Sequence, residues 1–136
     1  MADDVDDLVG LRILVVEDTL LVADFICDCL EGFGCIVVGP VARVQAALDL
    51  AAAESLDGAL LDVNIAGKFS FPVATALGAR NVPVVFLTGY DDAAMFPREF
   101  QSVPHIAKPF HLKNLEEVLS QQFGKIAKTR RSVPPG

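Results

Sequence analysis

Five short apolar runs recur along the chain, and each is followed by a longer stretch that has helical spacing of apolar residues or many alanines. The runs lie at residues 12–17, 35–39, 58–62, 83–87 and 105–108. They are rich in Val, Ile and Leu and nearly continuous, which is typical of strands buried on both faces. This alternation predicts an α/β fold in which a five-stranded parallel sheet carries helices on both faces.

The helical stretches are not equally strong. Helices are expected at residues 19–31, 44–54, 72–80 and 112–126. The stretch at residues 91–101 is weak because Pro97 interrupts it. Residues 64–70, which include Gly67, are expected to form a loop.

Charge is distributed unevenly along the chain. The formal net charge is −7, but residues 125–136 hold four Lys or Arg and no acid, so residues 1–124 carry seven basic and eighteen acidic side chains. A body this acidic does not favour binding to nucleic acid. We expect one domain at residues 11–124, an acidic arm at residues 1–10, and a frayed, basic, proline-containing tail at residues 125–136.

The chain has no apolar run long enough to span a membrane. The first ten residues contain four aspartates, whereas a secretory signal is basic at this position. Three cysteines form a poor disulfide framework and are expected to be structural. We therefore expect a cytoplasmic protein that does not contact a membrane.

Polar side chains stand where the predicted strands end. Glu17 and Asp18 follow the first strand, Asp62 ends the third, Thr88 follows the fourth, and Lys108 ends the fifth. The carboxyl ends of parallel strands meet at one rim of the sheet, where such folds bind ligands. We therefore expect these five residues to form one site.

The residue types at this rim suit phosphoryl transfer. Three carboxylates without a countercharge repel one another, and a hard cation such as Mg²⁺ relieves that repulsion. Lys108 adds a positive charge and Thr88 a hydroxyl donor, which together could position a phosphoryl group. Asp62 is the natural nucleophile, because carboxylates form aspartyl-phosphates in other proteins.

Four motifs in this order resemble the receiver domain of bacterial two-component response regulators. They are Val16-Glu17-Asp18, Leu61-Asp62-Val63-Asn64, Leu87-Thr88-Gly89 and Ala107-Lys108-Pro109-Phe110. Each motif is weak by itself, whereas the ordered set is specific, and the resemblance covers residues 11–124. It implies a flavodoxin-like sheet with strand order 2-1-3-4-5.

The resemblance also implies a function. Asp62 would accept a phosphoryl group from a histidine kinase or a phosphotransfer protein, Thr88 would hydrogen-bond a phosphoryl oxygen, and Lys108 would pair with the phosphate. The chain would then be a single-domain response regulator that signals by protein contact or acts as a phosphate sink or shuttle. It would support its own phosphorylation and dephosphorylation without being an enzyme for another substrate.

A magnesium site follows from the same resemblance. Asp18 and Asp62 would bind Mg²⁺ through their side chains, Asn64 through its backbone carbonyl, and Glu17 directly or through a water. Pro109 matches a proline that this family commonly holds after a cis peptide bond.

Two departures from the family pattern affect how signalling would work. His105 stands where the family has an aromatic switch residue, and histidine allows a pH-dependent switch there. Residues 86–90, Phe-Leu-Thr-Gly-Tyr, resemble an alphaproteobacterial subgroup whose fourth helix is altered or absent. We therefore expect a short or irregular fourth helix.

Other interpretations of these residues remain. The parts also suit a Mg²⁺-dependent phosphohydrolase that works through an aspartyl-phosphate, although Asn64 stands where the haloacid dehalogenase type has a second aspartate. The chain could also be a receiver-like module that is never phosphorylated. Glu17 and Asp18 could simply cap the next helix. His105 is expected to be a partly buried packing residue, and His111 a surface residue.

Overall fold

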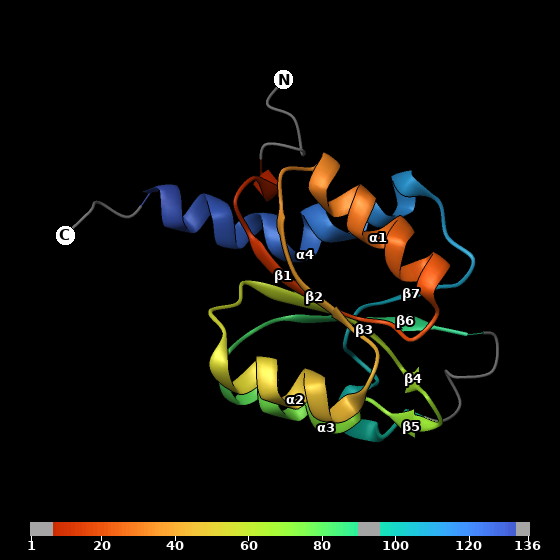
Figure 1. The fold of residues 1–136 in the computed structure, drawn as a ribbon. Coiled ribbons are helices and arrows are strands. Elements are labelled where there is room, and N and C mark those ends of the chain that lie inside the picture. Colours follow the sequence, from red (N-terminus) through yellow and green to blue (C-terminus); the bar gives the residue numbers. More distant parts are fainter. Residues whose placement is uncertain (1–6, 90–95, 133–136) are drawn as a thin grey trace.

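The computed structural model describes residues 7–89 and 96–132, with side chains described as far as residue 124. Five parallel strands form the central sheet (Figure 1). They are β1 (Arg12–Val16), β2 (Ile36–Val41), β3 (Gly58–Asp62), β6 (Val84–Thr88) and β7 (His105–Ala107). Their order is β2-β1-β3-β6-β7, which confirms the predicted order 2-1-3-4-5 once the five sheet strands are numbered along the chain.

Helices cover both faces of this sheet. They are α1 (Leu20–Gly32), α2 (Val44–Ala53), α3 (Phe71–Ala79) and α4 (Leu112–Ser132). Figure 1 shows α1 and α4 on one face and α2 and α3 on the other. Among the described residues, no helix is both long and apolar enough to cross a membrane.

Residues of each inner strand alternate between the two cores. In β1, Ile13 and Val15 pack toward α1 and α4, while Leu14 and Val16 pack toward α2 and α3. All four are fully buried. Because successive side chains of a strand point to opposite faces, a strand covered on both sides is apolar at every position. This explains why the strands were visible in the sequence as continuous apolar runs.

The loop expected at residues 64–70 is instead a small hairpin. Strand β4 (Asn64–Ile65) pairs antiparallel with β5 (Lys68–Phe69). The turn between them consists of Ala66 and Gly67, both with positive φ, at 52° and 85°. Two-residue strands are too short to show an alternating pattern, so the sequence offered no signal for them.

The connection from β6 to β7 agrees with a short or irregular fourth helix. The described part of it holds a 3₁₀ helix of three residues, Arg98–Phe100, which follows Pro97. Residues 90–95, where part of this helix was expected, lie outside the described residues. Phe96 is buried against Phe71 and Phe86, with ring centroids 5.5 and 5.2 Å away.

The two ends of the chain differ from expectation in detail. Leu8, in the stretch expected to be an acidic arm, is fully buried in the core between α1 and α4. Helix α4 continues to Ser132, so most of the tail that was expected to fray is helical. Lys and Arg have high helix propensity, which favours this extension.

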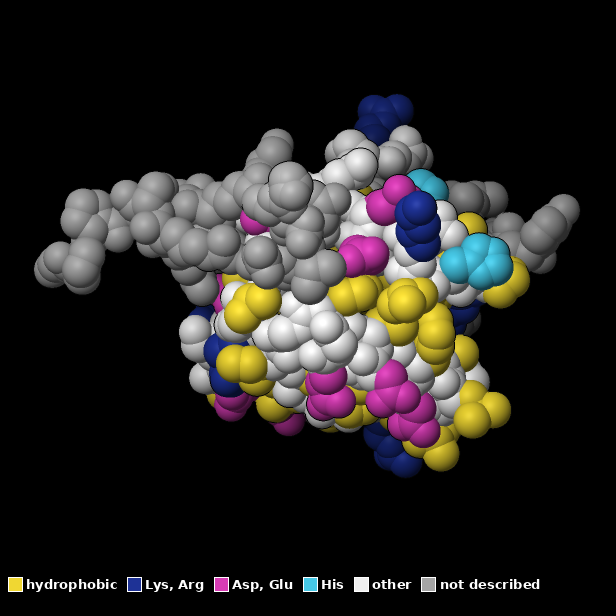
Figure 2. All heavy atoms as spheres, turned by 90° about the horizontal axis from the view of Figure 1, so that it is seen from above, with side chains coloured by type: hydrophobic (Ala, Val, Ile, Leu, Met, Phe, Trp, Pro, Cys, Tyr) yellow, Lys and Arg dark blue, Asp and Glu magenta, His cyan; other side chains and the backbone are white. Residues whose placement is uncertain are grey.

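The outer surface of α1 carries exposed apolar side chains. Leu20, Leu21 and Phe25 are 73, 80 and 41% exposed. Viewed from the side of α1 and α4, the molecule shows hydrophobic side chains interspersed with acidic ones (Figure 2). The start of this apolar surface lies close to the carboxyl end of β1, because only residues 17–19 separate that strand from α1.

Gly58 allows α4 to approach the sheet closely. A Cβ atom at this position would lie 2.7 Å from Cε1 of Phe123, whose side chain is fully buried. Real Cβ contacts are not that short, so a larger residue would displace the ring. The glycine is therefore required by packing between β3 and α4.

We predict that Gly58→Ala lowers the free energy of unfolding by about 1–3 kcal/mol, because the added methyl group overpacks the core. The matched control is Gly78→Ala in α3, where a Cβ meets nothing within 4 Å. That control should raise stability by about 0.5–1 kcal/mol, since alanine favours the helix. Urea denaturation measures both, and equal effects of the two substitutions would contradict the packing interpretation.

Candidate functional site

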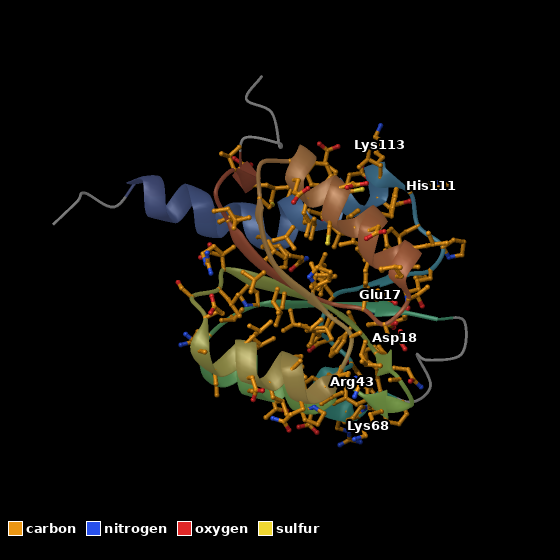
Figure 3. The ribbon with its side chains drawn as sticks, in the orientation of Figure 1. Glu17, Asp18, Arg43, Lys68, His111 and Lys113 are labelled. Atoms are coloured by element: carbon orange, nitrogen blue, oxygen red, sulfur yellow. The ribbon has the colours of Figure 1, made fainter. Side chains whose placement is uncertain are left out.

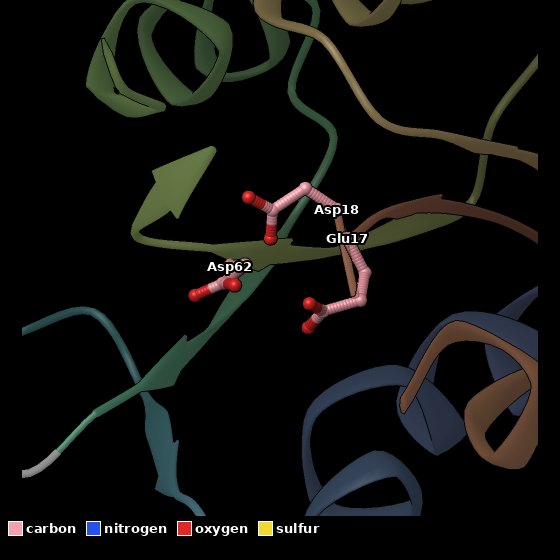
Figure 4. A group of neighbouring side chains, drawn as sticks. All are labelled: Glu17, Asp18 and Asp62. Atoms are coloured by element: carbon pink, nitrogen blue, oxygen red, sulfur yellow. The ribbon is translucent and has the colours of Figure 1, made fainter. Parts of the chain in front are cut away.

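Three carboxylates meet at the carboxyl ends of β1 and β3. Strand β1 ends at Val16, which is aligned with Leu61 of β3. The next residue of each segment, Glu17 after β1 and Asp62 at the end of β3, therefore lies beside the other. Figure 3 shows Glu17 and Asp18 at this rim. One carboxylate oxygen each from Glu17, Asp18 and Asp62 lies within 4.8 Å of the others (Figure 4).

Lys108 supplies the positive charge of the site. Its Nζ donates to Oε1 of Glu17 at 2.8 Å and to Oδ2 of Asp62 at 2.9 Å. Strand β7 positions it, because Ala107 is aligned with Thr88 of β6 and the backbone N–H of Lys108 donates to the Thr88 carbonyl. The Lys108–Pro109 peptide is cis, as is common in the family that the sequence resembles.

Glu17 and Asp18 play different parts. Glu17 is 2% exposed and uses both oxygens, since Oε2 also accepts the backbone N–H of Thr19. It therefore holds Lys108 and the start of α1 at the same time. Asp18 is exposed, and its Oδ2 accepts the backbone N–H of Ala66 at 2.8 Å. The hairpin turn thus orients one carboxylate of the site.

The environment of Asp62 favours its protonated form. Burial raises the pKa of Asp62 to about 6, with a further contribution from the nearby Glu17 carboxylate, although the hydrogen bond and charge of Lys108 act in the opposite direction. Burial alone would lower the pKa of Lys108, but its hydrogen bonds to Glu17 and Asp62, together with the charges of these carboxylates, outweigh burial and raise it. Lys108 therefore stays charged while the carboxylates around it are crowded.

Ser70 holds the backbone of Asp62 in place through a hydrogen bond. Its fully buried hydroxyl donates to the Asp62 carbonyl at 2.6 Å, and its N–H donates to the carbonyl of Val63. Neither Ser70 nor Ala66 is predicted from the sequence to belong to the site. A serine eight residues after the acid, or an alanine in a turn, gives no distinctive signal in the sequence.

Thr88 lies at the end of β6, as predicted, and is 3% exposed. Its hydroxyl donates to the carbonyl of Ile106 across a long 3.5 Å contact. A weak hydrogen bond of this length leaves the hydroxyl able to rotate to a better acceptor. Thr88 is thus available as a donor for a ligand at the rim.

Asn64 lies two residues after Asp62 and is exposed. Its side-chain Oδ1 accepts the N–H of Gly67 at 3.1 Å, which stabilises the hairpin turn. The side-chain oxygen of Asn64 is therefore engaged in the hairpin turn.

The prediction that His105 is a partly buried packing residue is wrong. His105 is exposed, because β7 is an edge strand and its first residue faces solvent. Its ring lies 6.0 Å from that of Phe96, so it adjoins the phenylalanine cluster without entering the core. His111 is exposed, as predicted.

The donor set suits a hard divalent cation. Carboxylate and carbonyl oxygens are the ligands that Mg²⁺ prefers in proteins, and a site with few protein ligands leaves room for water and phosphate oxygens. Glu17, Asp18 and Asp62 provide such oxygens in one cluster. The adjoining Lys108 and Thr88 could bind the oxygens of an anion held beside the cation.

We predict that, without divalent cations, Asp62→Asn raises the free energy of unfolding at pH 8 by about 1–2 kcal/mol, because it removes a carboxylate charge that folding disfavours. The pKa of Asp62 in the folded protein, about 6, lies above its ordinary value of 3.8. Protonation therefore favours folding, so the advantage of the variant shrinks as pH falls through 6 and is lost below about 4. Urea unfolding across this pH range measures it, and a variant that is less stable at pH 8 would contradict the prediction.

The family model for the response regulator receiver domain matches residues 13–120. Among curated relatives, the sensory transduction protein LytT of Bacillus subtilis is 28% identical over 126 residues, which cover 90% of this chain and 51% of the relative. The phyllosphere-induced regulator PhyR of Methylorubrum extorquens is 31% identical over 113 residues, covering 81% of this chain and 42% of the relative. The chain spans about half the length of these relatives.

Solved structures agree with this family. The solution structure of SdrG from Sphingomonas melonis has a TM-score of 0.73 and 38% identity, and the match covers 83% of this chain and 95% of SdrG. The receiver domain of the sensor histidine kinase PA1611 from Pseudomonas aeruginosa has a TM-score of 0.75 and 25% identity, with 85% of this chain and 98% of that one covered. That structure holds a magnesium ion in its active-site cleft. This chain therefore belongs to the response regulator receiver domain family, the signalling modules of two-component systems.

Proposed function

We propose that this chain is a cytoplasmic receiver whose Asp62 accepts a phosphoryl group from a histidine kinase or a histidine phosphotransfer protein. In this proposal the phosphorylated chain signals by protein contact or passes the group on as a phosphate sink or shuttle. The observation that carries the proposal is the contact of one lysine, Lys108, with both Asp62 and Glu17 at the point where three carboxylates converge. A lysine held there matches the charge of a phosphoryl group on Asp62.

The transfer is a substitution at phosphorus. A carboxylate oxygen of Asp62 forms a bond to phosphorus, while the bond from phosphorus to the donor's imidazole nitrogen breaks. The electron pair of that bond stays on the imidazole, which takes a proton from solvent. Hydrolysis later returns Asp62 to a carboxylate when water attacks phosphorus and inorganic phosphate leaves.

Lys108 and Thr88 would stabilise the phosphorylated form. Lys108 sits 2.9 Å from Asp62 Oδ2, within reach of an oxygen of a group attached there. Thr88 can exchange its weak contact with Ile106 for a phosphoryl oxygen, which is a stronger, charge-assisted acceptor. Both residues would therefore change partners upon phosphorylation.

The proposal includes a magnesium site made of the side chains of Asp18 and Asp62 and the backbone carbonyl of Asn64. Bound Mg²⁺ would neutralise charge on the carboxylates and on phosphoryl oxygens. Glu17 already has both oxygens engaged, with Lys108 and Thr19, so its contribution through a water is favoured over direct binding. The crowding of three acidic oxygens within 4.8 Å supports this assignment.

The exposed surface of α1 supports a protein as the phosphoryl donor. A groove of about 490 Å³ runs from Leu21 and Phe25 of α1 to Lys108 and Phe110. Its walls are largely apolar, and Lys108 of the acidic site is one of the residues that line it. Exposed apolar patches of this kind typically mark protein contacts, so a donor docked here would bring its histidine close to Asp62.

The alternative function, a phosphohydrolase of the haloacid dehalogenase type, receives less support. That chemistry would need an acid two residues after the nucleophile, and Asn64 occupies this position with its amide engaged in the hairpin turn. No described feature favours this alternative over the receiver function.

We predict that the wild-type chain incorporates one phosphoryl group from a small phosphodonor in the presence of Mg²⁺, and that Asp62→Asn incorporates none. Intact-protein mass spectrometry measures the incorporation. The matched control is Asp57→Asn, which changes another buried acid, directly before the same strand. The side-chain amide oxygen that this control introduces can still accept the Arg12 N–H, which Asp57 accepts at 2.8 Å.

This control should be phosphorylated like the wild type. Circular dichroism of both variants establishes that they are folded. Phosphorylation of folded Asp62→Asn at the wild-type rate would refute Asp62 as the acceptor.

A further inference from the structure

A second pocket, with the opposite charge, lies beside the acidic site. It has a volume of about 330 Å³ and is bounded by the start of α2 and the β4–β5 hairpin. The residues that line it are Arg43, Val44, Gln45, Ile65, Ala66 and Lys68. Figure 3 shows Arg43 and Lys68 near one another, on the α2 side of Asp18.

Among the described residues, the side chains of the two cations of this pocket lack partners of the kind that three other basic residues have. Arg12 pairs with Glu54 at 2.8 Å, Arg80 donates to backbone carbonyls at the end of α2, and Lys108 bridges two carboxylates. In contrast, the side chains of Arg43 and Lys68 form no hydrogen bond or ion pair with another residue of the described chain. Two positive side chains therefore line one pocket without an acidic side chain from the described part of the sequence paired to either of them.

Two acidic residues near this pocket, Asp18 and Asp49, are hydrogen-bonded to groups other than Arg43 and Lys68. The Asp18 carboxylate belongs to the cluster with Glu17 and Asp62, and its Oδ2 accepts the N–H of Ala66. Asp49 accepts a hydrogen bond from Gln45 at 3.1 Å, and the first turn of α2 contains no acid. The lack of compensation is unexpected in a body that has eighteen acidic and only seven basic side chains.

We propose that this pocket binds an anionic group, a carboxylate or a phosphate, between Arg43 and Lys68. The arginine guanidinium presents a planar set of donors that matches two oxygens of such a group, and the lysine adds a point charge. Val44 and Ile65 form apolar walls that reduce hydration of the ion pair. Carboxylate and phosphate share this recognition chemistry, and experiment can separate them.

The pocket is linked to the acidic site through Ala66. This residue lines the pocket, and its N–H orients the Asp18 carboxylate at 2.8 Å. An anion bound beside the hairpin therefore changes the surroundings of Asp18, and the reverse effect follows by thermodynamic linkage. Because the pocket residues are separate from Asp62, the proposal holds whether or not Asp62 is phosphorylated.

Amide NMR of the full ¹⁵N-labelled chain tests the site. The probe is inorganic phosphate, titrated at constant ionic strength without divalent cations. We expect saturable shifts of the Val44, Ala66 and Lys68 amides. Arg43→Gln and Lys68→Gln should each weaken binding at least about tenfold, since each removes a charge-assisted contact.

The matched control is Lys113→Gln, which removes an exposed lysine of α4 on the opposite side of the molecule (Figure 3). It should leave the titration curve unchanged. A parallel titration with acetate distinguishes a carboxylate ligand from a phosphate ligand. Saturation by acetate would indicate that the pocket binds acidic side chains, whereas saturation by phosphate alone would indicate that it binds a phosphorylated ligand. Shifts that never saturate with either anion, or an unchanged curve in both pocket variants, would overturn the proposal.

Discussion

The crowding of negative charge at the carboxyl end of β3 is the constraint on which the rest of the site depends. Asp62 is buried next to Glu17, and Asp18 contributes a third carboxylate within 4.8 Å. Lys108 balances part of this charge by touching two of the three acids. The remaining negative charge is what makes the rim suited to a divalent cation.

The apolar sheet is what holds these charges together. β1, β3 and β6 are buried on both faces, so their alignment is determined by packing and by the backbone ladder rather than by the polar residues. Ser70 and Ala66 then complete the site by binding the Asp62 carbonyl and the Asp18 carboxylate. Removing charge from the rim should therefore alter chemistry and local electrostatics while leaving the fold in place.

Much of this arrangement could be predicted from sequence because it follows from strand ends. Glu17, Asp62 and Lys108 each stand at or directly after the end of an apolar run, and parallel strands bring such ends together. The hairpin at Ala66 could not be predicted, since its strands have two residues each. The exposure of His105 depends on β7 lying at the edge of the sheet, which a local pattern does not reveal.

Contacts between residues far apart in the chain could not be predicted from the sequence either. Arg43 and Lys68 share a pocket only because α2 and the hairpin lie side by side in the fold. The close contact of Gly58 with Phe123 similarly needs the packing of α4 on β3, which no local pattern predicts. Sequence patterns therefore located the chemistry, whereas the structure revealed what supports it.

The most direct test of the Asp62 site is a crystal structure of the chain with Mg²⁺ and beryllofluoride, a mimic of the phosphoryl group. We expect beryllium on a carboxylate oxygen of Asp62, the cation on Asp18 and Asp62, and Lys108 in contact with a fluorine. Beryllofluoride bound at another residue would contradict the central claim. So would a structure in which Lys108 still bridges Glu17 and Asp62 and touches no fluorine.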